Sequence, residues 1–520
     1  MEPAMDTSKL SPGEGPSDIV AAEPTLARVT GSLGAALVIF GGLALALNLS
    51  GRVASVGTGW ASFSLAIGMV GLLFHAAFDA DTQFRRAYMM FGYLLLVFGV
   101  IAFTLPLFGG PVMFGLGCPV FLLGFFFLLA FLRQETDPAL RTMAQGALGL
   151  AGSMAAVVGM TGCLAGPESL RASGYLHHFF TLGLFGLVFL LGYFASRGMS
   201  DDFAWRSARL LFWAGLALFV YALLRSAAPP LLYSLGFTKA RPGDFFVPGG
   251  FLLMVLGGLY FASAGLISSE SKLAILTLRE LGAIFFSPIA YFVLVGFTLA
   301  AWLGYIGFID QLARSGRNIE PIVRGYVIDL VPVFAIIFIV PAITMRLLSE
   351  EQRSGTLEVL LTAPVSELTI VLSKFLAGLA MYLVVWAPFG LYLLALPLAG
   401  APAFDYRPLM SFFFGMSFTG AGFIAMGLFF SSLTRNQIIS GVLTFAGMLS
   451  LFIVAIIRER IFGQNPGGPW YQLLMHVSFL DVWNNTLEGK LVPKFLLFHG
   501  SFAVFWLFLT VKVLESRRWK

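Results

Sequence analysis

The chain of 520 residues has very little charge. Only 11% of its residues are charged and 58% are hydrophobic, with a mean hydropathy of +0.88. Soluble domains carry about a quarter charged residues, so an ordinary globular protein is excluded. The net charge of +5 is not arranged as a basic stripe interleaved with aromatic residues, and we therefore expect no nucleic-acid partner.

Residues that bind metals or form disulfides are equally scarce. The two cysteines, Cys118 and Cys163, both lie in apolar segments, which excludes a disulfide framework and a cysteine metal cluster. The five histidines show no HExxH or similar ligand spacing, so we expect no metal site. A Gly-x-x-x-x-Gly-Lys-Ser/Thr loop, which would hold the phosphates of ATP, is also missing from the sequence.

The first 27 residues are rich in Pro, Gly, Ser and acidic residues and read as a disordered tail. They lack the basic start of a secretory signal, so we expect the first apolar segment to stay in the protein as a membrane anchor.

Long apolar runs recur from one end of the chain to the other, and a run of about 20 residues suffices to cross a bilayer. They predict an all-α polytopic membrane protein with about 14 transmembrane helices. The predicted spans are 29–49, 60–78, 87–107, 111–132, 146–165, 175–195, 207–224, 246–267, 286–306, 326–345, 370–396, 408–431, 437–457 and 494–512. A modest excess of Lys and Arg in alternate connections places both termini in the cytoplasm.

The connection 346–364 carries an unusual concentration of polar residues between two apolar spans. Ser349 with Gln352 three residues later has the spacing of a helix capping box. Glu350 and Glu351 then fall in the first turn, where the helix dipole favours acids.

The second half of this connection has a different pattern. Gly355 interrupts the helix, Leu357, Leu360 and Leu361 form one apolar stripe, and Pro364 ends it. The spacing predicts a short two-part amphipathic element. By pattern alone it fits a loop helix lying on the membrane or on its own bundle better than it fits a docking element.

The order of these residues resembles a known family. Met345-Arg346, Glu350-Glu351, Arg353-x-Gly355-Thr356-Leu357-Glu358 and Pro364 look like the coupling region of permease subunits of type-2 ABC exporters, including those linked to gliding motility. Arg279-Glu280-Leu281 and Phe285-Phe286-Ser287-Pro288 resemble the family's entry segment. Lys374 and the basic ending Glu515-Ser516-Arg517-Arg518-Trp519-Lys520 also match in order.

The resemblance covers roughly 268–520 and implies a six-helix permease domain there, after an eight-helix membrane region at 28–267. It implies ATPase-coupling residues and an entry helix, and no catalytic residue. The coupling residues are Glu350, Glu351, Arg353, Gly355, Thr356, Leu357, Glu358, Leu361 and Pro364; the entry-helix residues are Arg279, Glu280, Ser287 and Pro288.

The resemblance also implies partners. A separate ABC ATPase subunit would bind ATP and Mg, this chain would bind no cofactor itself, and a second permease copy would complete the translocation unit. It implies a transporter subunit in the bacterial inner membrane rather than an enzyme. The substrate cannot be read from the sequence.

Two connections outside the coupling region have patterns of their own. In 268–285, Ala274, Leu278, Leu281 and Phe285 form an apolar stripe, with Lys272, Arg279 and Glu280 off it, which predicts an interfacial helix. The aromatic-rich connection 458–493 fits either short helices dipping into the outer leaflet or a loop folded over the bundle.

Other functions stay open on the residues alone. An ion-coupled secondary transporter would need ionisable groups near the membrane centre, and the candidates Asp329, His75 and Asp79 all lie near span ends. A lipid-modifying enzyme would need clustered polar residues at one depth. An ABC-linked envelope or motility assembly component cannot be separated from an exporter by sequence.

Overall fold

A computed structural model describes residues 17–49, 58–79, 81–104, 114–164, 176–198, 201–237, 248–285, 287–315, 322–327, 330–362, 364–398, 407–462 and 468–518. Every element of this part of the chain is a helix. Fourteen helices in it are long and apolar enough to span a membrane. Eight of them precede residue 269 and six follow, which confirms the predicted all-α polytopic fold.

Contacts between helices divide the chain into two compact units. One comprises Met1–Thr161 with Thr181–Ala204, and the other comprises Gly162–Phe180 with Trp205–Lys520. The division in contacts therefore falls after residues 161, 180 and 204. The assignment of 28–267 and 268–520 to separate domains rests on the family resemblance and stays a prediction.

The first unit is built from paired helices. Its elements are α1 (Ser17–Leu49), α2 (Thr58–Phe78), α3 (Thr82–Thr104), α4 (Phe114–Gln134), most of α5 (Pro138–Leu164) and most of α7 (Leu176–Arg197). Helices α1 and α2 approach closely, since a Cβ on Gly34 would stand 2.8 Å from the carbonyl oxygen of Gly68. Small residues at such contacts let helix backbones pack tightly in a membrane.

A polar cluster stands at one end of this unit. His75 and Asp79 are buried, with Nε2 of His75 2.8 Å from Oδ2 of Asp79, and the Tyr88 hydroxyl lies 2.9 Å from Nδ1 of His75. These polar groups therefore lie together near a span end. The third candidate from the sequence, Asp329, lies outside the described residues.

The second unit contains the end of α5 and the start of α7, then most of α8 (Asp202–Ser234) and all of α9 (Pro248–Ser268), and it continues to the end of the chain. Its further helices are α10 (Lys272–Phe285), α11 (Pro288–Ser315), α12 (Ile322–Val327), α13 (Leu330–Thr344), α14 (Ser349–Ser354), α15 (Thr356–Thr362), α16 (Glu367–Leu398), α17 (Arg407–Leu433), α18 (Gln437–Ile457), α19 (Pro469–Val477), α20 (Phe479–Leu487) and α21 (Pro493–Arg518). A π-helical turn, Arg458–Phe462, extends α18.

Helix α17 lies at the centre of this bundle and packs against α13, α16, α18, α20 and α21. Two glycines make this possible. A Cβ on Gly420 would stand 2.2 Å from the ring of Tyr382, and one on Gly427 would stand 2.3 Å from the Thr344 hydroxyl. Close packing through small residues is what holds membrane helices together.

The aromatic-rich connection 458–493 divides into two parts with different environments. Helix α20 is folded into the bundle, where Trp483 is buried and donates its indole N–H to the Thr419 hydroxyl at 3.0 Å. Helix α19 buries none of its residues, and Trp470 is 62% exposed. The alternative of a loop folded over the bundle therefore describes α20, whereas insertion of α19 into the outer leaflet stays a prediction.

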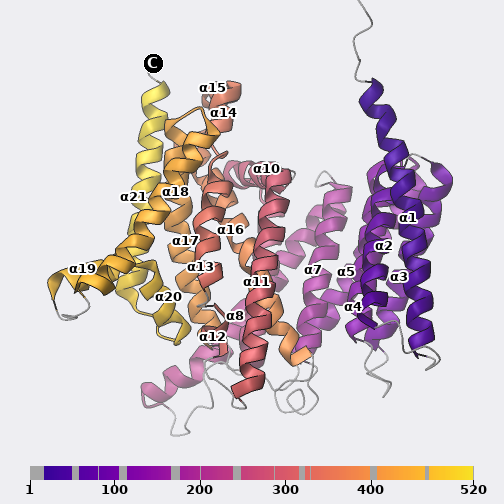
Figure 1. Ribbon diagram of the computed structural model, residues 1–520, viewed down its shortest axis with the longest axis horizontal. Helices are drawn as coiled ribbons and strands as arrows, with labels where there is room; N and C mark the ends of the chain where they lie inside the picture. Colours follow the sequence, from indigo (N-terminus) through magenta and orange to yellow (C-terminus); the bar gives the residue numbers. More distant parts are fainter. Residues whose placement is uncertain are drawn as a thin grey trace, which may run out of the picture. The chain divides into compact units, whose positions relative to one another are not determined.

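Within the second unit, α14 and α15 stand at one end of the bundle (Figure 1). Helix α10 and the C-terminal end of α21 lie at the same end, whereas α12 and α20 lie at the other. The charged connection 346–364 therefore forms a distinct element beyond the spans that it joins.

Candidate functional site

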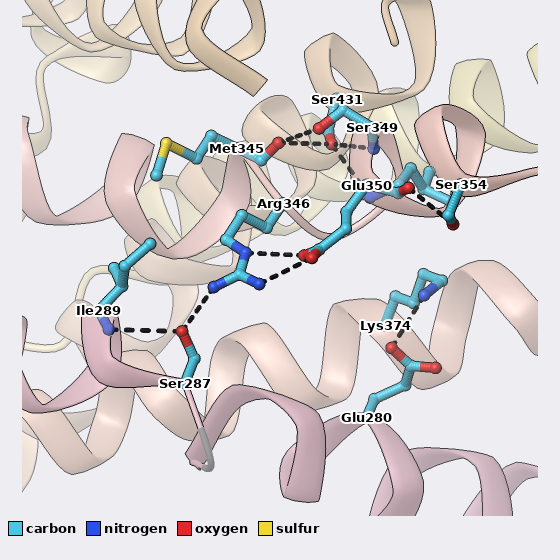
Figure 2. A network of polar contacts seen from close by, with 11 residues as sticks. Glu280, Ser287, Ile289, Met345, Arg346, Ser349, Glu350, Ser354, Lys374 and Ser431 are labelled. Carbon is cyan, nitrogen blue, oxygen red and sulfur yellow. Dashed lines mark hydrogen bonds and ion pairs between the residues drawn. The ribbon is translucent and has the colours of Figure 1, made fainter. Parts of the chain in front are cut away.

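The site is a polar network that joins the end of α13 to α10, α14 and α16 (Figure 2). Arg346 follows α13 directly and makes a bidentate contact with Glu350, with Nε to Oε2 at 2.7 Å and Nη2 to Oε1 at 2.8 Å. Its Nη1 donates to the Ser287 hydroxyl at 2.5 Å, and that hydroxyl accepts the backbone N–H of Ile289 at 3.3 Å. Arg346 thus fixes the first turn of α14 to the start of α11. Paired N–H···O bonds of this kind are among the strongest that side chains make.

A buried lysine holds two further acids. Lys374 is 1% exposed, and its Nζ lies 2.8 Å from Oε2 of Glu280 and 2.8 Å from Oε1 of Glu351. Arg279 contacts Glu280 at 2.7 Å and lies 3.8 Å from Glu351. The three helices α10, α14 and α16 therefore meet at one ammonium group.

The ionisation of Glu280 reflects this environment. Burial by itself raises the pKa of a carboxyl group, but the attraction of Lys374, with its hydrogen bond and that of Arg279, outweighs burial and lowers the pKa of Glu280. Glu280 is consequently a carboxylate at neutral pH, and a buried carboxylate is tolerable because it is paired.

This burial corrects the prediction for α10. The helix forms at Lys272–Phe285 as expected, but its buried residues are Ala274, Thr277 and Glu280. The apolar residues Leu278 and Leu281 are only half-buried. Glu280 was expected on the polar rim, and the reason it turns inward is Lys374, 94 residues later in the sequence.

The predicted capping box is wrong. The α14 helix is capped at Leu348 without a side-chain hydrogen bond, and the Ser349 hydroxyl donates back to the Met345 carbonyl. The hydroxyl of Ser431, on α17, instead accepts the backbone N–H groups of Leu348 at 3.1 Å and Ser349 at 3.0 Å. A cap supplied by another helix has no local sequence signature.

Gln352 has a different role from the one predicted. Its side-chain amide donates to the Ser432 carbonyl at 2.9 Å rather than reaching back to the start of α14. The same carbonyl accepts a bond of 2.8 Å from Arg517, near the end of α21. The first half of the connection is thus tied to the C-terminal ends of both α17 and α21.

The predicted break at Gly355 is confirmed. Its φ of 75° is left-handed and ends α14, after which α15 begins at Thr356. Glycine adopts this conformation without the clash that a Cβ would cause. Helix α15 ends at Thr362, before Pro364, and the Pro364 carbonyl accepts a bond of 2.8 Å from Lys272 on α10.

The predicted coupling residues therefore fall into two groups. Glu350, Glu351 and Leu357 turn toward the protein, with Leu357 only 3% exposed. Exposed residues of α14–α15 and their flanks form the second group, which we call the outer face. Its members are Arg353, Ser354, Gly355, Thr356, Glu358, Val359, Thr362 and Pro364. Leu361 is half-buried, and the side chain of Pro288 lies outside the described residues.

Sequence reasoning missed several residues of the network. Lys374 was noted only as a basic residue that opens a span, and Ser431 was not singled out. A signal for Lys374 existed, since a lysine inside a predicted span needs a partner acid. The serine had no signal, because serines are common in membrane helices and its role depends on tertiary packing.

A pocket of about 270 Å³ opens inside this network. Residues of α10, α11, α13, α14 and α16 line it, including Glu280, Arg346, Glu351 and Lys374. Among the described residues, no group of three or more His, Cys, Asp or Glu side chains is placed to hold a metal ion. The charged groups of the site instead hold helices together.

Comparison with known proteins gives one match. Residues 308–511 match the family model described as ABC-2 family transporter protein. No curated protein and no solved structure matches the chain. The matched segment contains α12 to α20 and most of α21, with the whole connection 346–364, but begins after α10. The match shows that 308–511 is similar to the ABC-2 family of transporter proteins, and together with the apolar helices it supports a multi-pass membrane protein that is a permease component of an ABC transporter.

Proposed function

We propose that the chain is the permease subunit of an ABC exporter whose ATP is hydrolysed by a separate subunit that docks on the outer face of α14–α15. The observation that carries this proposal is the division of the connection 346–364 into an anchored side and a free side. Its acids Glu350 and Glu351 are held internally, while Arg353, Glu358 and Val359 point away from the bundle.

The anchored side suits the transmission of movement. Arg346 joins α14 to α11, Lys374 joins it to α10 and α16, and Ser431 joins it to α17. Several short charge-assisted contacts make such a unit stiff. A displacement of α14–α15 by a partner would therefore move four helices together rather than deform a loop.

The free side suits docking. Val359 is 71% exposed and stands beside Glu358, with Arg353 in the preceding helix. A central apolar contact with a charged rim is the usual anatomy of a protein–protein interface. On this basis Arg353, Gly355, Thr356, Glu358 and Pro364 are the residues that we propose to touch the ATPase, while Glu350, Glu351 and Leu357 position them.

The remaining parts of the proposal come from the family resemblance. Six spans follow α10, so a second permease copy would complete the translocation path. ATP and Mg would be bound by the partner subunit. The resemblance also implies a gliding-motility-like family member in the bacterial inner membrane. Both termini would be cytoplasmic, which agrees with the basic residues in the connections at the α14 end.

Affinity purification tests the proposal. The tagged chain is isolated from native membranes in mild detergent, co-purifying chains are identified, and ATP hydrolysis is measured. We expect a stoichiometric subunit with a phosphate-binding loop, which is retained by the exposed-site control Leu491→Asp and lost in Val359→Asp. Leu491 is 44% exposed and lies outside the spans, before α21. A chain that purifies alone and without ATPase activity would refute the proposal.

A further inference from the structure

The pocket beside α14 has a position that points to a membrane ligand. Ile289, Ala290 and Val293 line it and are the first residues of the candidate span Ile289–Arg314. The α10 residues Ala283 and Ile284, from the helix just before that span, also line it. The pocket therefore lies where the apolar part of the protein ends, at the depth of lipid headgroups.

Its lining is divided by chemistry. Val293, Ile343 and Met381 contribute apolar surface, whereas Ser354 and Thr356 contribute hydroxyl groups beside the charged network. Ligand sites are commonly apolar with a few placed polar groups. Such a lining suits an amphiphile, with a polar head at the network and a chain toward the membrane.

The charges of the lining favour a head that donates hydrogen bonds. Three carboxylates, those of Glu280, Glu350 and Glu351, line the pocket with only two cations, Arg346 and Lys374. In the described part of the chain, Oε2 of Glu351 is buried and accepts no hydrogen bond. A buried carboxylate oxygen without a partner is costly, and a donor that reaches it would be stabilised.

Arg279 adds a cation close to the same carboxylate. Its side chain is 53% exposed and lies 3.8 Å from Oε1 of Glu351. A headgroup that carries an ammonium and a phosphate would thus meet carboxylates in the lining of the pocket and positive charge beside them. A purely anionic headgroup would face three carboxylates.

We propose that this pocket binds the primary ammonium headgroup of an amphiphile, with the ammonium donating to the carboxylate of Glu351. The volume of about 270 Å³ accommodates a headgroup and its first methylene groups but not a whole lipid. The chain of the ligand lies outside the pocket. The site needs no ATPase, so it stands apart from the proposed function.

The test uses the full-length chain in a neutral detergent and native mass spectrometry. Short-chain phosphatidylethanolamine, phosphatidylcholine and phosphatidylglycerol are offered at equal concentration. We expect retention of the ethanolamine lipid at least about tenfold above the other two, because choline has no N–H to donate and glycerol leaves the phosphate unbalanced. Equal retention of ethanolamine and choline lipids would overturn the proposal.

Two matched variants locate the site. Val293→Trp fills the pocket, whereas Val295→Trp places the same side chain on the same helix at a position 59% exposed. Retention of the ethanolamine lipid is expected to fall about tenfold in the first and to stay unchanged in the second. If Val293→Trp does not fold, Glu351→Gln serves instead, since it keeps the shape and removes the charge. Unchanged retention in the variant used would overturn the proposal.

The source of the ammonium is distinguished by competition. Hexylamine is expected to displace the ethanolamine lipid if both use the ammonium site. Hexylamine binding that is sensitive to Val293→Trp, without any lipid retention, would assign the site to a soluble amine of the same chemistry. If the ethanolamine lipid stayed bound at saturating hexylamine, recognition of the ammonium group would be contradicted.

Discussion

Lys374 of α16 and Glu280 of α10 lie 94 residues apart in sequence, and their charged groups meet at 2.8 Å in the interior of the site. Glu351 of α14 reaches the same ammonium group. The entry helix, the first half of the connection 346–364 and the following span are therefore joined by one buried cation. This junction makes α14 a part of the bundle rather than a loose loop.

Removing the ammonium group of Lys374 should destabilise the protein strongly. Lys374→Met leaves two buried carboxylates without their partner, and breaking a buried ion pair costs about 3–5 kcal/mol. We expect a large loss of thermal stability in detergent. Adding Glu280→Gln and Glu351→Gln to Lys374→Met should recover much of it, because no buried unpaired charge then remains and Arg279, which loses its partners, is 53% exposed. Lys512→Met is the control, since Lys512 is 53% exposed and pairs with Glu515 at the surface. A triple variant less stable than Lys374→Met would contradict the assignment.

The pH dependence of this junction follows from the lowered pKa of Glu280. A carboxyl whose pKa is lower in the folded state contributes stability above its unfolded pKa, about 4.3, and loses it as pH falls through the folded value. The difference in melting temperature between the wild type and Glu280→Gln should thus be constant from about pH 8 to pH 5 and shrink below about pH 4. A difference that shrank between pH 8 and pH 6 would point to another group.

The cap from α17 can be tested at single amides. Ser431→Ala removes the acceptor of two backbone N–H groups, those of Leu348 and Ser349. Leaving buried donors unsatisfied costs about 1–3 kcal/mol, so hydrogen exchange of these amides should accelerate. Ser417→Ala on the same helix is the control, because that exposed hydroxyl bonds only within α17. Unchanged exchange at residues 348 and 349 would remove Ser431 from the site.

The hinge between α14 and α15 depends on a left-handed glycine. Gly355→Ala should cost about 1–2 kcal/mol of strain, although no atom stands within 4 Å of a Cβ there. Gly355→Asn should cost less, since asparagine tolerates this conformation. Gly296→Ala, in the middle of α11 with equally open surroundings, should leave the melting temperature unchanged or slightly raised. Equal effects of the two alanines would mean that the backbone at Gly355 is not constrained.

The sequence predicted features that are local and missed those that are not. Apolar runs are continuous in the chain, so the fourteen spans could be counted. Gly355 and Pro364 end helices through the backbone conformation of adjacent residues, so their effects could be predicted too. The pairing of Glu280 with Lys374 and the cap from Ser431 depend on helices 94 and more than 80 residues away. The inward turn of Glu280 was missed for this reason. Hydrophobic periodicity assigns a glutamate to the polar face of a helix and takes no account of a partner in another helix.

The most direct test of the account is photo-crosslinking in native membranes. A photoreactive residue replaces Val359 on the outer face of α15, and another replaces Leu491, exposed in the connection before α21. We expect a crosslink from position 359 to a chain with a nucleotide-binding motif, and none from position 491. Crosslinks from position 359 to lipid alone would contradict the docking of an ATPase on α14–α15.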